Sequence, residues 1–295
     1  MKAIWAAIGL AVTVPATASE TGACRVERPA DGDLKSHAAR YFAKADTAAI
    51  DALLTCLGDP DSAVRDGFAF TLWSEGLRGQ RVAPALMRHA NARLQAMIAA
   101  PEDAVGFRRP FAALALAEVA RADRIAPFLT DSELHGLAEA GATYLRGVTD
   151  YRGFTPGEGW RHGVAHGADL MLQLSLNPRL ARADAELLLG AIAAQVAPAA
   201  GAYYVHGEPG RLAAPVLYLA RRPDIDDATW AAWFRTLHPD AGARWQVAYA
   251  SDAGLAAVHD STAFANAIYV SASESQDPRI RRLAPLAVEL IKALP

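Results

Sequence analysis

The residues of this chain that are best suited to chemistry lie between positions 150 and 173. Two histidines four residues apart are followed by an aspartate three residues later, giving His162, His166 and Asp169. A helix advances about 100° per residue, so these side chains would share a band roughly 80° wide with Glu158 and Gln173. Positions i, i+4 and i+7 can ligate one metal ion, and zinc or a similar divalent cation would suit two imidazoles and a carboxylate.

Three interpretations of this polar stripe are open from the sequence. In a metal-dependent hydrolase, the two histidines and Asp169 would hold the ion while Glu158 or Glu208 acted as general base. The run HGVAH lacks the glutamate that follows the first histidine in zinc proteases, so that particular mechanism is not indicated. The same side chains could bind a polar ligand without catalysis, or form a structural network with neighbouring loops. Whether the chain is an enzyme is therefore undecided by the sequence.

Charged residues at two joints between predicted helices could complete the site. Asp150 and Arg152 come just before the stripe, and Glu208 and Arg211 open a later helix. Joints in a stacked helical array lie on one edge, where either arginine would suit a carboxylate or a phosphate. In the simpler alternative, Glu208 and Arg211 form a local ion pair while Asp150 and Arg152 brace their turn. The candidate ligand-binding residues are Asp150, Arg152, Trp160, His162, His166, Asp169, Glu208 and Arg211.

Local signals predict where the helix of the stripe begins and which of its sides is apolar. The run TPGE at residues 155–158 has the pattern of a capping box with proline in the first turn, so the helix should extend from there to about residue 176. Trp160 would then lie on the apolar side, opposite the histidines, and neither histidine would belong to the core. Gly159, Gly163 and Gly167 would form a second stripe, which indicates close approach of a neighbouring backbone or of a ligand.

The remainder of the chain predicts an all-α scaffold. Alanine and leucine dominate, and prolines and glycines fall mostly between apolar-periodic segments. Asp46 should cap a helix, and GDPDSAVRD at residues 58–66 is typical of a HEAT-type repeat, with Asp61 as the cap and Arg65 reaching neighbouring turns. We predict stacked antiparallel helix pairs in an α-solenoid, and a closed α/α toroid would give much the same pattern. The other predicted helices cover residues 46–57, 62–75, 80–99, 104–121 with a kink or a restart at Pro110, 131–148, 181–196, 209–221, 227–237, 259–273 and 277–294.

The N-terminal residues predict an exported protein. Residues 1–18 combine a lysine, an apolar run and small residues in the pattern of a cleaved signal peptide, so the mature chain should be periplasmic or secreted. Residues 19–45 should form an irregular lead-in, followed by a single helical-repeat domain over residues 46–295. Cys24 and Cys56 are the only cysteines and predict a disulfide in an oxidising compartment. Two free thiols, or a lipid anchor at Cys24, are the alternatives.

Charge and hydropathy argue against a nucleic acid as a partner and against a transmembrane segment. The chain has 29 Lys+Arg against 32 Asp+Glu, so it lacks the basic surplus that a nucleic acid would require. After the predicted signal no segment offers about 18 uninterrupted apolar residues, so a transmembrane segment is not expected.

Four runs of the sequence carry a family resemblance. They are GDPDSAVRD at residues 58–66, RPFAALALA at 109–117, DYRGFTPGEGWRHGVAHGAD at 150–169 and HGEPGRLA at 206–213. In this order they resemble the bacterial family known as domain of unknown function 2785. The resemblance implies a HEAT-like helical domain and carries over no activity. Glu208 and Arg211 match the family pattern Gly-Glu-Asp-Glu-Arg-Leu, whereas Pro209 and Gly210 replace its two inner acids.

Our leading prediction is an exported helical-repeat protein that binds a small polar or anionic ligand, or a polar segment of a partner protein, in a groove lined by the candidate residues. The alternatives are the metal-dependent hydrolase and a non-catalytic scaffold for protein interactions.

Overall fold

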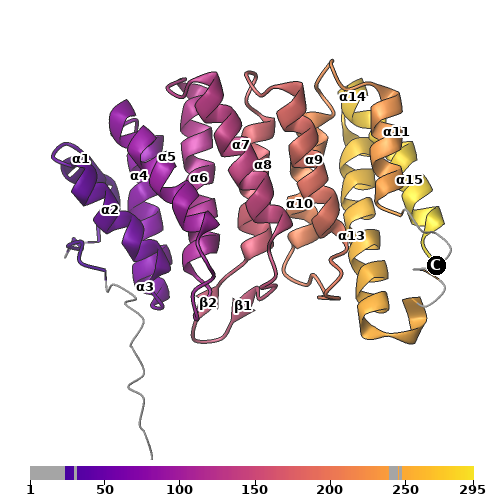
Figure 1. The fold of residues 1–295 in the computed structure, drawn as a ribbon, viewed down its shortest axis with the longest axis horizontal. Coiled ribbons are helices and arrows are strands. Elements are labelled where there is room, and N and C mark those ends of the chain that lie inside the picture. Colours follow the sequence, from indigo (N-terminus) through magenta and orange to yellow (C-terminus); the bar gives the residue numbers. More distant parts are fainter. Residues whose placement is uncertain (1–23, 30–31, 239–244, 246–247) are drawn as a thin grey trace, which may run out of the picture.

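The computed structural model describes residues 24–29, 32–238, 245 and 248–295, and this part of the chain is built almost entirely of helices (Figure 1). The predicted all-α class is confirmed. The predicted signal peptide lies outside the described residues. The α-helices are α1 Leu34–Phe42, α2 Thr47–Thr55, α3 Ser62–Val64, α4 Thr71–Arg78, α5 Pro84–Ala99, α6 Arg108–Ile125, α7 Asp131–Arg146, α8 Gly163–Ser175, α9 Arg182–Val196, α10 Glu208–Leu219, α11 Asp227–Thr236, α13 Asp252–Glu274, α14 Pro278–Arg281 and α15 Leu283–Ala293.

Smaller elements join these helices. A π-helical turn at Arg65–Phe70 connects α3 to α4, and 3₁₀ turns occur at Cys56–Gly58 and Ala248–Ala250. Two short strands, β1 Phe154–Thr155 and β2 Gly159–Trp160, pair antiparallel between α7 and α8.

The helices are arranged in two rows. Helices α4, α6, α8, α10 and α13 contact one another in that order, and α2, α5, α7 and α9 form a second row that packs against the first. The elements follow the long axis of the molecule, so α1 and α15 lie at opposite ends and the array does not close into a ring (Figure 1). The alternative of a closed toroid is therefore wrong, and the assignment as a HEAT-like solenoid stays a prediction. Helix α8 lies in the middle, covered by α6, α7 and α10.

Several helices begin at side-chain caps that the sequence identifies. The Asp46 carboxylate accepts a hydrogen bond from the Ala49 amide at 2.9 Å, and Asp61 accepts one from the Ala63 amide at 2.9 Å. Thr130 and Glu133 form a reciprocal capping box at the start of α7. Each cap satisfies an amide that the first helical turn leaves without an intrahelical partner. The predicted starts at Asp46 and Asp61 are confirmed.

Two predictions about the N-terminal half need correction. The lead-in predicted to be irregular contains α1, because Ala38 and Phe42 lie four residues apart and bury one face against α4. The helix predicted over residues 104–121 begins at Arg108, which places Pro110 in its first turn. A proline there gives up no helical hydrogen bond, so the predicted kink does not occur.

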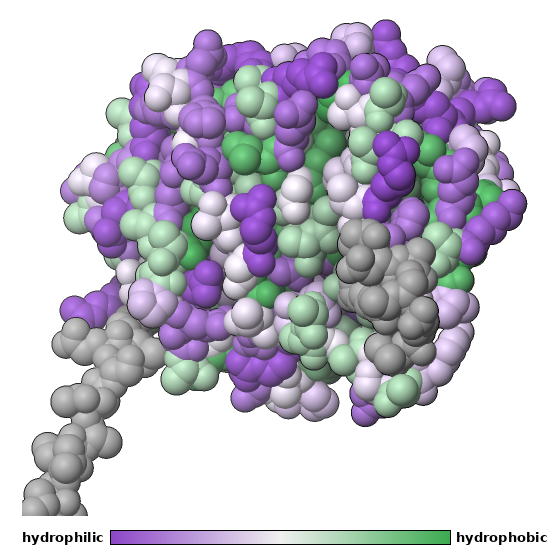
Figure 2. Space-filling view, turned by 45° about the vertical axis from the view of Figure 1, so that its right-hand side comes forward, coloured by the Kyte–Doolittle hydropathy of each residue, from purple (hydrophilic) through white to green (hydrophobic). Residues whose placement is uncertain are grey.

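One face of the molecule gives little sign of a large apolar interface. Over the described residues seen in Figure 2, polar and apolar side chains are interspersed and form no single continuous apolar patch. None of the helices in the described ranges is long and apolar enough to cross a bilayer.

The predicted disulfide is present between Cys24 and Cys56, whose Cα atoms are 4.6 Å apart. It ties the segment before α1 to the end of α2 and encloses a sequence separation of 32 residues. No cysteine in the described part of the chain is free.

Replacing both cysteines with serine should lower the free energy of unfolding by about 3 to 4 kcal/mol, because the open chain gains conformational entropy when unfolded. Urea unfolding of the oxidised wild type and of the Cys24→Ser, Cys56→Ser variant measures the difference. Dithiothreitol should shift the wild-type midpoint and leave the variant unchanged, and equal midpoints for both proteins would contradict the prediction.

Candidate functional site

A β-hairpin occupies the place where the sequence predicts the start of a helix. Phe154 pairs with Trp160 and Thr155 with Gly159, and helix α8 begins only at Gly163. Gly157 and Gly159 have φ angles of 83° and 85°, a region that favours glycine. The predicted capping box at residues 155–158 is therefore wrong, because Pro-Gly followed by a second glycine makes a tight hairpin turn instead. Glu158 is not on the helix, and Trp160 does not lie on its apolar side.

Two buried arginines hold the hairpin against the helices. The Arg65 guanidinium, which is 0% exposed, donates to the carbonyl oxygens of Asp59 at 2.9 Å and Glu158 at 3.0 Å. Arg161 donates to the Val105 carbonyl at 2.7 Å and to the Glu158 carboxylate at 2.9 Å.

Both guanidiniums also lie against the ring of Phe107. Their central carbons are 3.7 Å (Arg65) and 4.3 Å (Arg161) from the ring centroid. Such cation–π contacts are worth about 2 kcal/mol when desolvated. Arg65 thus has the structural role predicted for it. No local sequence pattern marks Arg161 or Phe107, because their roles arise from contacts across the fold.

His162 follows the hairpin directly and starts α8 in a strained conformation. Its φ and ψ of 57° and 39° are in the left-handed region, which is uncommon for a residue with a side chain. The imidazole stacks on Trp160 with a centroid distance of 4.8 Å and an interplanar angle of 27°. Its Nε2 lies 3.2 Å from the His206 carbonyl oxygen and 3.5 Å from the Glu208 carboxylate. The contacts of the imidazole with Trp160, His206 and Glu208 therefore stabilise the left-handed conformation of His162.

The joint between α9 and α10 interlocks with this hairpin. A Cβ atom added at Gly153 would lie 2.2 Å from Nδ1 of His206, so the imidazole packs directly on the glycine backbone. The His206 ring also meets Trp160 edge-on at 5.6 Å. Its own amide donates to the Glu208 carboxylate at 2.9 Å. A side chain at position 153 would therefore displace the His206 ring from its place beside Trp160.

Glu208 is a buried carboxylate that the site keeps ionised. Its side chain is 3% exposed, and Oε1 lies 3.5 Å from His162 and 3.8 Å from Nδ1 of His206. Burial acts to raise the pKa of Glu208, but hydrogen bonds from His162 and from the backbone amides of His206 and Glu208 outweigh it and lower the pKa below its usual value. The site therefore contains a fixed negative charge beneath two imidazole rings.

His166 belongs to the core, contrary to the prediction. It is 8% exposed and meets the Phe111 ring edge-on at 5.1 Å. Burial, with a smaller contribution from the positive charges of His162 and Arg211, lowers the pKa of His166 to about 3. The helical stripe is buried here because α6 and α10 cover α8 from both sides, which the periodicity of one helix cannot reveal.

The other charged candidates form ion pairs. Arg211 pairs with both carboxylate oxygens of Asp169 at 2.5 Å, linking α10 to α8. The predicted local pair between Glu208 and Arg211 is therefore not formed. Asp150 and Arg152 do pair with each other, with Nε to Oδ1 at 2.8 Å, as the simpler alternative predicted. Both arginine side chains remain half exposed.

The structure does not support the metal site predicted at His162, His166 and Asp169. Within the residues that the structure describes, no group of three or more His, Cys, Asp or Glu side chains is arranged to hold a metal ion. The physical reason is that the three side chains have separate environments. His162 lies against Glu208, His166 against Phe111, and the Asp169 carboxylate is taken by Arg211.

His166 gives the folded protein a specific dependence on pH. Between about pH 6.5 and pH 3 the unfolded chain binds a proton at this imidazole while the folded chain does not, so stability present above pH 6.5 is lost as the pH falls. The slope from this residue is at most about 1.4 kcal/mol per pH unit. Urea unfolding of wild type and His166→Gln at about pH 7 and pH 4.5 should show a smaller loss for the variant.

A matched control for this measurement is His238→Gln, at a histidine beyond the end of α11. It should retain the wild-type loss of stability on acidification. If His166→Gln and His238→Gln lost the same free energy on acidification, His166 would not be held neutral in the fold.

Comparison with known proteins shows the family to which the sequence of this chain belongs. A search of curated proteins and of solved structures found no match to the chain. The model of a family described as "Protein of unknown function (DUF2785)" matches residues 94–270, which include the hairpin, α8 and the start of α10. This match covers more than half of the chain, and the chain therefore belongs to the DUF2785 family of proteins of unknown function.

Proposed function

We propose that this protein binds a small polar ligand at the surface formed by Phe154, Trp160 and His206, hereafter the Trp160 surface. The observation that carries the proposal is that Trp160 is exposed yet fixed in place. Its side chain is 39% exposed, while its ring stacks on His162, meets His206 edge-on and contacts Phe154 at 5.2 Å. A rigid aromatic ring facing solvent offers a large contact area at a low entropic cost to a ligand with one flat apolar face.

The groups around the Trp160 surface supply directional polar contacts. His206 is 30% exposed, and the buried Glu208 carboxylate beneath it fixes its position. The strained backbone of His162 is also of the kind that clusters at ligand sites. A few polar groups converging beside an apolar platform are the usual composition of a small-molecule site.

The ion pairs at the edge of this region narrow the class of ligand. Asp150 neutralises Arg152, and Asp169 neutralises Arg211. Neither arginine offers an unmatched positive charge, so a highly charged anion has less to gain here than a neutral or zwitterionic polar molecule. Each guanidinium is half exposed and can donate further hydrogen bonds to such a ligand.

Export is a second part of the proposal. The pattern of residues 1–18 predicts a cleaved signal, and the Cys24–Cys56 disulfide supports folding in an oxidising compartment. We therefore expect the ligand to be an extracytoplasmic solute.

Ligands can be sought through the thermal stability of the protein, because a ligand that binds only the folded state raises the unfolding midpoint. Neutral sugars and zwitterionic amino acids are suitable probes. Trp160→Ala should weaken the binding of any hit at least tenfold, because it removes the stacking surface. Tyr269→Ala, at an aromatic residue 42% exposed on α13, is the matched control and should bind as wild type does. Hits bound equally well by Trp160→Ala would overturn the proposal.

Charge removal at the two ion pairs separates ligand contacts from bracing. Arg152→Gln and Arg211→Gln should each weaken the same ligand severalfold while changing the free energy of unfolding by less than about 1 kcal/mol, since both guanidiniums are half exposed. Titration calorimetry and urea unfolding on the same samples give both quantities. Destabilisation without any change in affinity would assign these arginines to bracing alone.

A further inference from the structure

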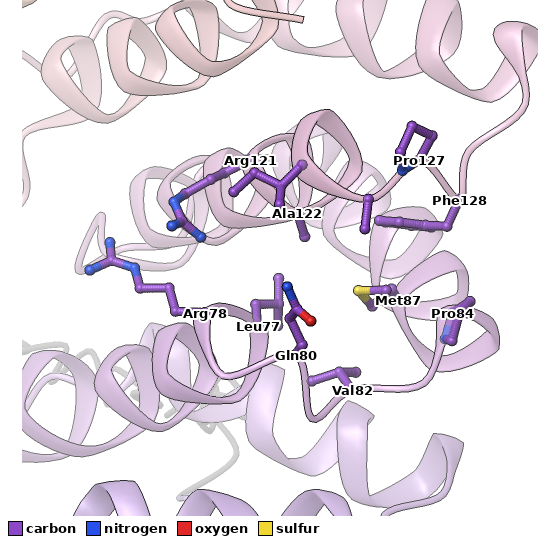
Figure 3. Close-up of a pocket in the computed structure, with 12 residues that line it drawn as sticks. Leu77, Arg78, Gln80, Val82, Pro84, Met87, Arg121, Ala122, Pro127 and Phe128 are labelled. Carbon is purple, nitrogen blue, oxygen red and sulfur yellow. The ribbon is translucent and has the colours of Figure 1, made fainter.

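A cavity of about 480 Å³ lies in the N-terminal half of the helical array, and residues between Leu77 and Phe128 line it. It is enclosed by the end of α4, the turn that follows, the first turn of α5 and the end of α6 (Figure 3). Its size falls within the range of roughly 300 to 1,000 Å³ that is usual for small-molecule sites.

The cavity has a cationic end and an apolar end. Arg78 and Arg121 approach it from one side, while Met87 and Phe128 line the other (Figure 3). Ile125 also lines it and is 49% exposed. Methionine adapts readily to the shape of an apolar ligand.

The charges in the lining are unbalanced. Two arginines and no acidic residue line the cavity. Arg78 pairs with Glu118 on α6, with Nε to Oε2 at 3.1 Å, and is neutralised by it. Among the described residues, by contrast, Arg121 has no ion pair and no hydrogen bond from its side chain. One guanidinium therefore faces the cavity with its charge unmatched.

We propose that this cavity binds a small organic carboxylate with an apolar body. A guanidinium recognises a carboxylate through two parallel hydrogen bonds, and Arg121 is free to form them. The apolar wall would take the body of the ligand out of water. An inorganic anion would leave that wall uncovered, and a neutral apolar molecule would leave the charge of Arg121 unanswered.

This site is separate from the Trp160 surface. The cavity is lined by residues 77–128, whereas the Trp160 surface is built from residues 154–206. Substitutions at one should leave binding at the other unchanged, so failure of either proposal can be told from failure of the other.

Octanoate, 1-octanol and acetate test the two ends of the cavity by titration calorimetry on the mature protein. Octanoate should bind with a stoichiometry of one and at least tenfold more tightly than either 1-octanol, which lacks the charge, or acetate, which lacks the apolar body. Arg121→Gln should weaken octanoate at least tenfold and leave 1-octanol unchanged. Arg235→Gln, the same change at an exposed arginine on α11, is the matched control and should bind as wild type does.

Filling the cavity gives an independent test. Ala126 lines it and is exposed at the end of α6, so Ala126→Trp should abolish octanoate binding without unfolding the protein, as circular dichroism would confirm. Absence of octanoate binding to the wild type, equal binding of octanoate and 1-octanol, or full binding by Arg121→Gln would each overturn the proposal.

Discussion

Two buried guanidiniums on one phenylalanine ring hold the Trp160 hairpin, and the rest of the candidate site depends on them. A hairpin with two residues in each strand is not stable by itself, so its position must come from tertiary contacts. Arg65 reaches it from the π-helical turn that follows α3, and Arg161 anchors it from its own end. Removing a guanidinium from water costs several kcal/mol, and carbonyl acceptors together with the Phe107 face offset that cost. Burial lowers the pKa of Arg65, and the adjacent Asp66 carboxylate opposes that shift.

Much of the scaffold could be predicted because its signals are local. Asp46 and Asp61 cap helices within three residues of themselves, and apolar spacing marks the helices that follow. The run TPGE failed because the same four residues satisfy both a capping box and a hairpin turn. The glycines favour the hairpin turn, and a hydrogen bond from Arg65 to the Glu158 carbonyl, across 93 residues of sequence, stabilises it. A second glycine at position 159 was the one local sign of the hairpin.

In the candidate site, too, features set by neighbouring residues could be predicted and features set by contacts between distant segments could not. The sequence brings together the right segments, since residues 150–169 and 206–211 do meet. Several predicted side-chain contacts are wrong, because the periodicity of one helix does not show which neighbouring helices cover it. Asp169 and Arg211 pair across 42 residues in preference to the local pairing of Glu208 with Arg211. His166 shares a helical face with Asp169, yet Phe111 from α6 encloses it in the core. Burial of this kind is a property of the row of helices and is absent from the periodicity of any one of them.

Gly153 has a consequence for how the Trp160 surface is assembled. Its missing side chain allows the His206 ring to pack on the backbone between α7 and β1. The segment before α8 and the segment before α10 therefore form one continuous surface. Neither joint contains the surface alone, and the surface exists only while α8 and α10 are docked. Any local opening that separates these helices dismantles the whole surface at once, and a ligand bound there would stabilise the contact between α8 and α10.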